Sequence, residues 1–234
     1  MRVLEARARR GRCEADDCRA DTRGTFGNQY TPYTKGVYTV DVSSKDTTHK
    51  IAVAARRLLD REGAGAVTMR RVAQAAGLTA MAIYRHYPDR AALLNVLADE
   101  GFEALSASLT GRRFSGDLER RLTRMADFFL DYAFESPRLF ELMFLEPRAG
   151  ARRYPGDFKG RKSPTATLMA DMIAAGMASG ELRRDDHWEI AFEMGALSHG
   201  LIMLYLGGRM DMSPAAFRAL YRRSFRRYFN GIRA

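Results

Sequence analysis

The side chains with the clearest chemical potential in this sequence lie in one short segment, residues 68–94. Its middle carries a hydroxyl, a phenol and a guanidinium on what would be one helical face, at Thr79, Tyr84 and Arg85. Hydroxyl and phenol groups hydrogen-bond to phosphate oxygens, and a guanidinium forks onto a phosphate or onto the edge of a guanine. These residue types therefore indicate a surface that binds a polyanion.

The overall charge is compatible with such a partner. The 234 residues include 38 Lys and Arg against 28 Asp and Glu, a formal net charge of +10. An excess of this size favours nucleic acid or an anionic membrane surface as partner. Most of the basic residues are arginine, which suits phosphate and guanine contacts but equally reflects a GC-rich genome. Composition alone does not decide between these two explanations.

Four helices with tight connections must position this face. Apolar residues recur at three- and four-residue spacing, and a Ser/Thr/Asp-type cap precedes each run. The caps of the second, third and fourth helices are Thr68, Thr79 and Asp89. The predicted helices run from Asp46 to the glycines at 63 and 65, then over Met69–Ala76, Ala80–His86 and Arg90 to about Leu105.

The second and third of these helices meet the requirements of a helix-turn-helix. Ala73 is small enough for the two helices to cross, and Gly77 tolerates the positive φ that the turn needs. The third helix would then direct its exposed face to a major groove, and the helix start at Thr68 would offer backbone N–H groups to a phosphate. Apolar residues are placed to fill the corner: Val72, Leu78 and Ile83.

Between roughly His49 and Leu97 the sequence closely resembles the TetR family of bacterial transcriptional regulators. The matching positions are Val72-Ala73, Ala76-Gly77-Leu78-Thr79, Ile83-Tyr84-Arg85-His86-Tyr87, Arg90 and Leu93-Leu94. The departures are mild. Tyr87 stands where the family usually has Phe, Arg90 where it has Lys, and Met81 where Gly is common.

The resemblance implies a set of DNA contacts. Thr68, Tyr87 and Arg90 would position the phosphate backbone, together with Tyr84 and His86, and only contacts to base edges would specify sequence directly. Arg85 has two possible partners, a guanine edge or a phosphate. The full DNA-binding set is Thr68, Arg70, Thr79, Ala80, Met81, Tyr84, Arg85, His86, Tyr87 and Arg90.

The rest of the chain is also predicted to be helical, which makes the fold class all-α. Further helices are expected over Asp117–Phe134, Pro137–Phe144, Thr165–Ser179, Asp186–Leu206 and Pro214–Phe229, with a loop at Glu146–Pro164. The expected domains are a tail at 1–45, a helix-turn-helix domain at 46–97 and, as the resemblance implies, a helical effector-binding and dimerisation domain at 98–234. The tail lacks a helical or strand period, apart from weak alternation at Gly36–Val42, and is expected to be disordered or to stem from a start codon assigned too far upstream.

For the C-terminal region the resemblance implies a homodimer built through the last two helices and a small-molecule site. The protein would be a repressor that binds a palindromic operator in double-stranded DNA and is released by a small apolar ligand. The segment Met194–Arg209 is similar to a TetR subgroup named for a Trp-His-Gly signature, although Ser198 replaces the Trp.

Met and Phe residues are unusually frequent between 125 and 177, and such sets line adaptable apolar pockets or simply fill a core. His199 faces the same choice between a ligand contact and a core or interface position. The predicted pocket residues are Phe128, Phe129, Tyr132, Met143, Met172 and His199.

Other kinds of site find little support. Cys13 and Cys18 form a lone C-x4-C pair without a nearby His, so free thiols are expected and neither a metal nor another cofactor is. Gly195–Gly200 lacks the G-x-S-x-G spacing of a nucleophile motif, so no catalytic residue is assigned and the protein is not expected to be an enzyme.

The longest apolar run, Met194–Leu206, is too short and too polar to span a bilayer, and the N-terminus lacks the apolar core of a signal peptide. A cytoplasmic protein with no membrane partner is therefore expected. Three alternatives stay open: a DNA-binding regulator without a small-molecule effector, an activator, and a membrane-surface protein, which the dispersed arginines disfavour.

Overall fold

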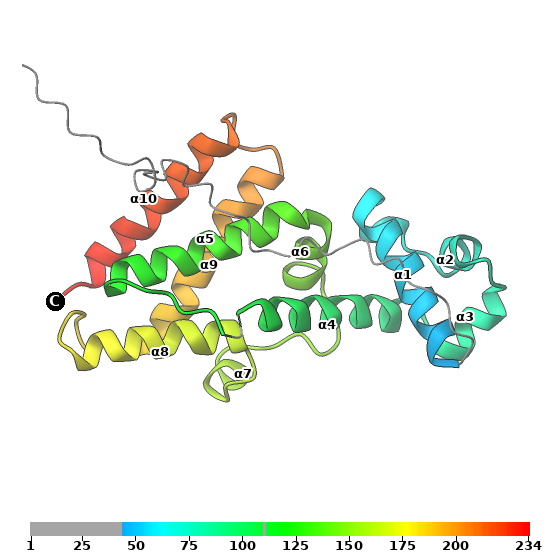
Figure 1. Ribbon diagram of the computed structural model, residues 1–234, viewed down its shortest axis with the longest axis horizontal. Coiled ribbons are helices and arrows are strands. Elements are labelled where there is room, and N and C mark those ends of the chain that lie inside the picture. The colour runs from blue at the N-terminus through cyan, green and yellow to red at the C-terminus, as the bar shows by residue number, and fades with distance from the viewer. Residues whose placement is uncertain (1–43, 110) are drawn as a thin grey trace, which may run out of the picture. The chain divides into compact units, whose positions relative to one another are not determined.

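The structure is a computed structural model that describes residues 44–109 and 111–234, with side chains from residue 46 onward. The regular elements within these residues are helical (Figure 1), which confirms the all-α prediction. The predictions for the tail at 1–45, including Gly36–Val42 and the two cysteines, lie outside the described residues. The helices are α1 (Ser44–Glu62), the 3-10 helix η1 (Ala64–Ala66), α2 (Met69–Ala76), α3 (Ala80–His86), α4 (Arg90–Leu109), α5 (Leu118–Glu135), α6 (Pro137–Phe144), α7 (Gly156–Lys159), α8 (Pro164–Ala178), α9 (His187–Leu206) and α10 (Pro214–Ile232).

The starts of α2, α3 and α4 follow the predicted caps, whereas α1 already begins at Ser44, so Asp46 lies within its first turn and does not cap it. Thr68 Oγ1 and Thr79 Oγ1 each accept a hydrogen bond from the backbone N–H three residues on, at 3.3 and 3.2 Å. Asp89 Oδ1 caps α4 in the same way at 2.7 Å. Gly77 ends α2 with a φ of 65°, a conformation that costs other residues free energy. These short-range interactions explain why the helix bounds could be predicted so closely.

The corner of the helix-turn-helix is closed by apolar side chains. Val72 and Ile83 are fully buried, Ala73 is nearly so, and Leu78 is partly covered. Helix α2 packs against both α1 and α3, while α1 also packs against α4. The crossing that the small residue and the glycine predicted is therefore present.

Helix α4 links the helix-turn-helix to the C-terminal helices. It continues without a break across residue 97, the predicted domain boundary, and ends at Leu109. Along its length it packs against α1, α6 and α8, and α6 itself also packs against α1. Gly101 allows a close approach here, since a Cβ at this position would lie 2.6 Å from Met143 Sδ of α6. Both α4 and α6 are thus shared between the helix-turn-helix and the C-terminal region.

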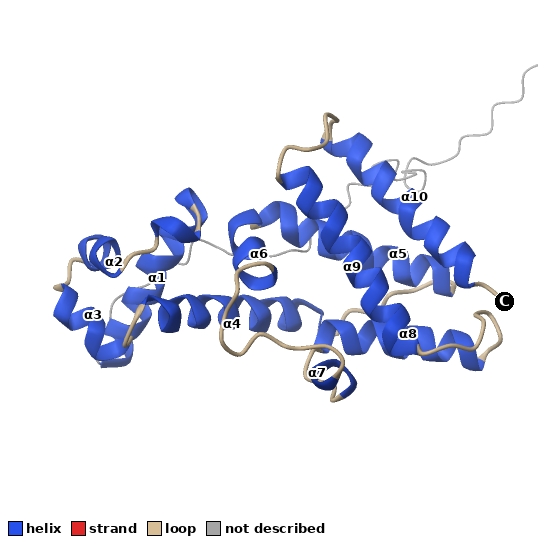
Figure 2. Cartoon of the chain, turned by 180° about the vertical axis from the view of Figure 1, so that it is seen from behind, coloured by secondary structure: helices blue, strands red, loops and turns tan. Residues whose placement is uncertain are grey.

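The C-terminal region is assembled around α9. This helix packs against α5, α8 and α10, and α10 packs in turn against α5 (Figure 2). None of the described helices is long and apolar enough to cross a membrane. The predicted Glu146–Pro164 loop contains the four-residue helix α7, which is too short to produce a detectable period in the sequence.

One buried hydroxyl group connects α5, α9 and α10. Tyr221 of α10 is fully buried, and its hydroxyl donates to the carbonyl of Ala126 in α5 at 3.1 Å. The Ser198 hydroxyl of α9 lies 2.5 Å from the same oxygen and therefore acts as the donor to it. Burial raises the pKa of Tyr221 well above its ordinary value, so the phenol stays protonated and able to donate.

We expect Tyr221→Phe to lower the free energy of unfolding by about 1–2 kcal/mol, because the Ser198 hydroxyl and the Ala126 carbonyl lose their buried partner. Urea unfolding followed by circular dichroism measures the change. Tyr84→Phe is the matched control, because Tyr84 is half exposed, and it should shift stability by less than about 0.5 kcal/mol. Equal stability of the Tyr221 variant and the wild type would contradict the role of this hydroxyl.

Candidate DNA-binding surface and internal cavity

The outward face of α3 is exposed as the sequence predicts. Met81 is 67% exposed and Tyr84 50%, large values for apolar and aromatic side chains. Ile83 on the opposite face is buried and anchors the helix. The exposed face presents Thr79, Ala80, Met81, Tyr84 and Arg85.

The start of α2 adds two more exposed residues, Thr68 and Arg70. Thr68 Oγ1 is the acceptor in its capping bond, so its O–H remains able to donate to a phosphate oxygen. The neighbouring Arg71 forks onto the Glu62 carboxylate at 2.7 and 2.9 Å and holds α2 to the end of α1. The pKa of Glu62 is lowered mainly by this hydrogen-bonded contact.

Three further residues of the predicted DNA-binding set connect elements within the helix-turn-helix domain. Tyr87 is buried, and its hydroxyl donates to the Thr48 carbonyl at 3.4 Å. His86 Nδ1 lies 2.8 Å from Thr48 Oγ1. The exposed Arg90 donates to two carbonyls at the segment before α2, at 2.8 and 2.7 Å. These three side chains tie α1 and η1 to the end of α3 and the start of α4.

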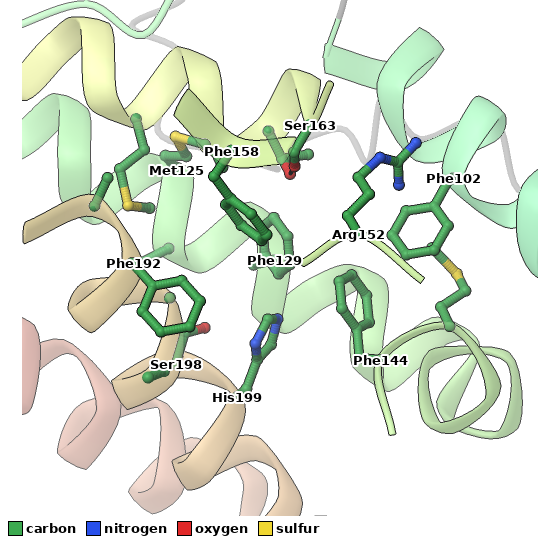
Figure 3. A pocket seen from close by; sticks show the side chains of 18 of the residues that line it. Phe102, Met125, Phe129, Phe144, Arg152, Phe158, Ser163, Phe192, Ser198 and His199 are labelled. Carbon is green, nitrogen blue, oxygen red and sulfur yellow. Dashed lines mark hydrogen bonds between the residues drawn. The ribbon is translucent and has the colours of Figure 1, made fainter. Parts of the chain in front are cut away.

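The second notable feature is a cavity of about 300 Å³, partly open to solvent, among helices α4 to α10 (Figure 3). Aromatic rings and methionines make up most of its wall. His199 projects from α9 into the space beside Phe129 and Phe144, and Phe192 lies on the same helix (Figure 3). The large apolar lining residues are Phe102, Met125, Phe129, Met143, Phe144, Phe158, Met169, Phe192 and Phe225.

Polar atoms in this wall are few. His199 packs against the Phe144 ring with centroids 4.6 Å apart, and its buried Nε2 has no hydrogen-bond partner among the described residues. Burial lowers the pKa of His199 to about 4, so the imidazole is neutral near pH 7. The other polar lining residues are Arg148, Arg152, Ser163, Thr165 and Ser198.

Models of two protein families match this chain in succession. The N-terminal model, described as bacterial regulatory proteins of the tetR family, matches residues 51–97. The second, described as a tetracyclin repressor-like C-terminal domain, matches residues 122–228. Together they span most of the chain. The protein belongs to the TetR family.

The relatives of this TetR-family chain are transcriptional regulators. It is 26% identical over 140 residues to the HTH-type transcriptional regulator Rv1816 of Mycobacterium tuberculosis, and to the same extent to Mb1846 of Mycobacterium bovis. Each match covers 58% of this chain and 60% of the relative's length. The chain thus spans about 60% of the length of these relatives, and the matches support the family and its N-terminal DNA-binding domain.

Solved structures share the fold. A Rhodococcus sp. RHA1 protein of unknown function aligns with a TM-score of 0.65 at 23% identity, covering 80% of this chain and 96% of that one. NalD of Pseudomonas aeruginosa, the secondary repressor of the MexAB-OprM efflux pump, aligns with a TM-score of 0.54 at 19% identity, covering 79% and 96%. The Trp-His-Gly subgroup stays a prediction, because neither matched family description names it.

Half of the pocket residues predicted for this TetR-family chain line the cavity. Phe129, Met143 and His199 do; Phe128, Tyr132 and Met172 do not. Successive helix residues point about 100° apart, so Phe128 faces away from Phe129 and packs under the Arg112 guanidinium.

The other two predicted pocket residues that do not line this cavity, Tyr132 and Met172, have partners elsewhere. The Tyr132 hydroxyl donates to the Gly101 carbonyl at 3.1 Å, in the joint between α4 and α5. Met172 is 3% exposed and forms part of the packed core. A stripe of apolar residues identifies a buried helix face, but it does not tell a solid core from a cavity wall.

Several residues of the cavity wall were not predicted from the sequence. Phe158, Arg148 and Arg152 come from the predicted loop, where no period shows which side chains turn inward. Phe102 lies on α4, outside the Met- and Phe-rich stretch between residues 125 and 177. The one sequence signal at this loop is its number of charged residues, and that signal favours exposed side chains.

The lowered pKa of His199 predicts a pH dependence of stability. The unfolded chain takes up a proton near pH 6.5 whereas the folded protein does so only near pH 4, so stability falls as pH drops through this window. Wild-type protein should lose about 3 kcal/mol more between pH 7 and pH 4 than His199→Leu. Chemical unfolding at a series of pH values measures this, and parallel profiles for the two proteins would contradict it.

Proposed function

We propose that this TetR-family protein is a homodimeric repressor that binds a palindromic operator and releases it when a small apolar ligand occupies the cavity. The observation that carries the proposal is that the cavity wall includes side chains of α4 and α6, the two helices that also pack against α1 of the helix-turn-helix domain. A ligand that changes how α4 and α6 pack therefore acts directly on the support of the DNA-binding surface. Because its operator would be chromosomal, we place its action in the cytoplasm.

On the DNA, α3 is proposed to enter the major groove with Thr79, Ala80, Met81, Tyr84 and Arg85 facing the bases or the adjacent backbone. Thr68 and Arg70 at the start of α2 would hold a phosphate, helped by the free backbone N–H groups of the first turn.

His86, Tyr87 and Arg90 are proposed to contribute mainly by fixing the orientation of α3. Their hydrogen bonds to Thr48 and to the segment before α2 hold α3 against its neighbours. A helix held at a defined angle can present all of its outward side chains to one groove.

A second copy of the chain is the proposed partner of α9 and α10. Along α9 the residues Phe192, Ala196, Gly200 and Leu204 recur every four positions and are exposed. A row of exposed apolar side chains along a helix favours burial, so this stripe needs a covering surface. Gly200 has no neighbouring atom within 4 Å of the position of a Cβ, which leaves room for the close approach of another helix.

Two half-sites about one DNA turn apart require two helix-turn-helix domains at a matching separation. Ligand binding need only favour a different separation to weaken DNA binding, and a coupling of about 1–3 kcal/mol is typical of such systems. Close packing supports such a change in separation, because close-packed helices shift between discrete arrangements instead of compressing.

We expect Arg85→Ala to weaken operator binding by about tenfold or more if the guanidinium forks onto a guanine, with a smaller loss on scrambled DNA. Equal weakening on both duplexes would assign Arg85 to the phosphate backbone. Fluorescence anisotropy with the chain's own upstream region and a scrambled duplex measures both affinities. Arg113→Ala, an exposed arginine on the segment between α4 and α5, is the control and should change neither.

If purified wild-type protein shows no salt-sensitive, sequence-preferring complex with any member of a broad pool of random duplexes, the DNA-binding proposal is wrong. A compound that binds the cavity but leaves the anisotropy of the DNA complex unchanged would favour a regulator without a small-molecule effector.

Leu204→Arg should dissociate the dimer, because a charge is then buried within the proposed α9 seam. Leu145→Arg is the matched control, since Leu145 is 47% exposed against 45% for Leu204 and lies at the end of α6. Sedimentation velocity at micromolar concentration should show a monomer for the first variant and a dimer for the second and for the wild type. A wild-type monomer, or a dimer that tolerates Leu204→Arg, would contradict this interface.

A further inference from the structure

The cavity wall has an unbalanced charge. Among the described residues that line it are two arginines, Arg148 and Arg152, and no Asp or Glu. Arg152 Nε donates to the neutral Lys162 carbonyl at 2.7 Å, and a carboxylate that interacts with its charge, Asp157, is itself paired with Lys162. A guanidinium beside an apolar cavity is more stable with an anion close by, because few water molecules can solvate it there.

Arg148 is the more buried of the two, with 7% of its side chain exposed. It donates from one terminal nitrogen to Asp99 Oδ1 at 3.0 Å. Its Nε is buried and has no hydrogen-bond partner within the part of the chain that the structure describes. A buried N–H without an acceptor is unfavourable, so this donor is available to an occupant of the cavity.

Both guanidinium groups are held on the same ring. The centre of the Arg148 guanidinium lies 5.2 Å from the centroid of Phe102, and that of Arg152 lies 4.7 Å from it. Figure 3 shows Arg152 and Phe102 together at one side of the cavity with Phe144 next to them, and Phe129, His199 and Phe192 farther away. The wall is therefore cationic at its α4 side and aromatic across the rest.

We infer that the cavity binds an apolar carboxylic acid, with its carboxylate at Arg148 and Arg152 and its hydrocarbon or aromatic body against Phe129, Phe144 and Phe192. The inference rests on the proposed function, since it names the chemical class of that effector. A guanidinium fork matches the two oxygens of a carboxylate, and an aromatic wall matches an uncharged body.

The acidic side chains near the two arginines do not prevent a ligand carboxylate from binding there. Asp99 is already paired with Arg148 and is mostly exposed, and Glu103 lines the adjoining groove beside Arg152 without forming an ion pair within the described residues. A volume of about 300 Å³ corresponds to about ten non-hydrogen atoms, which sets the size of the acid. A cationic ligand would meet two arginines at the α4 side and gain only ring contacts in return.

Octanoate has this size and charge, and 1-octanol and octylamine keep the same chain with a neutral or cationic end. Isothermal titration calorimetry on the full chain should show octanoate bound about tenfold or more tightly than 1-octanol, with octylamine weakest. Arg152→Gln should lower the affinity for octanoate to that for 1-octanol and leave the affinity for 1-octanol unchanged. Arg152→Lys should retain part of the preference for octanoate. Arg120→Gln, the same charge change on an exposed arginine outside the cavity, should bind like the wild type.

Binding of 1-octanol as tight as that of octanoate, or an octanoate preference that survives in Arg152→Gln and in Arg148→Gln, would overturn the inference. So would the failure of octanoate to bind. Thermal unfolding of each variant confirms that it is folded before titration.

Adding each probe to the DNA complex separates this inference from the proposed function. If 1-octanol and octanoate release the DNA equally well, the proposal of a repressor controlled through the cavity stands, and the inference that its ligand is a carboxylic acid is overturned. Tight, Arg152-dependent octanoate binding without DNA release would support the acid site and contradict the effector role.

Discussion

The hydrogen bonds of Tyr221 are the constraint on which the shape of the C-terminal region depends. A phenol this deeply buried must keep both of its partners, because an unpaired hydroxyl in an apolar interior is unfavourable. Its partners, Ser198 on α9 and Ala126 on α5, both lie in the cavity wall. The same interaction that joins three helices therefore sets the spacing of α5 and α9, which together form one wall of the cavity.

From this anchored side the cavity extends toward α4 and α6. The rings of Phe102 and Phe144 meet edge to face with centroids 5.2 Å apart, one from each helix, and both rings line the cavity. One wall is thus fixed by the buried hydroxyl, and the other belongs to helices that also support α1. A ligand placed between a fixed wall and a shared one would transmit its volume mainly to the shared helices, because well-packed interiors compress little.

Two of the four buried polar side-chain atoms that lack a hydrogen-bond partner among the described residues belong to the cavity wall. These are His199 Nε2 and Arg148 Nε, whereas the other two, in Tyr154 and Thr167, lie outside the lining. In the helix-turn-helix, the helix caps, the turn glycine and the buried apolar corner residues all satisfy the local requirements of the fold. Groups that break such requirements are expected where a protein binds something else.

The sequence by itself determined the helices, their caps and the helix-turn-helix. These features depend on interactions across three or four residues, such as Thr68 with the N–H of Arg71, and on backbone conformations such as that of Gly77. The exposed face of α3 follows from the same period, because burying Ile83 leaves Tyr84 and Arg85 outside. Locality is the physical reason that this part could be predicted.

Only the tertiary structure decided which side chains meet inside the C-terminal region. It separated Phe129 from Phe128 and brought Arg148 and Arg152 from a loop without periodicity onto the ring of Phe102. It also turned Tyr87 and Arg90 toward Thr48 and the segment before α2. These contacts join residues far apart in the chain and depend on the angles at which helices pack, which a hydrophobic pattern does not encode.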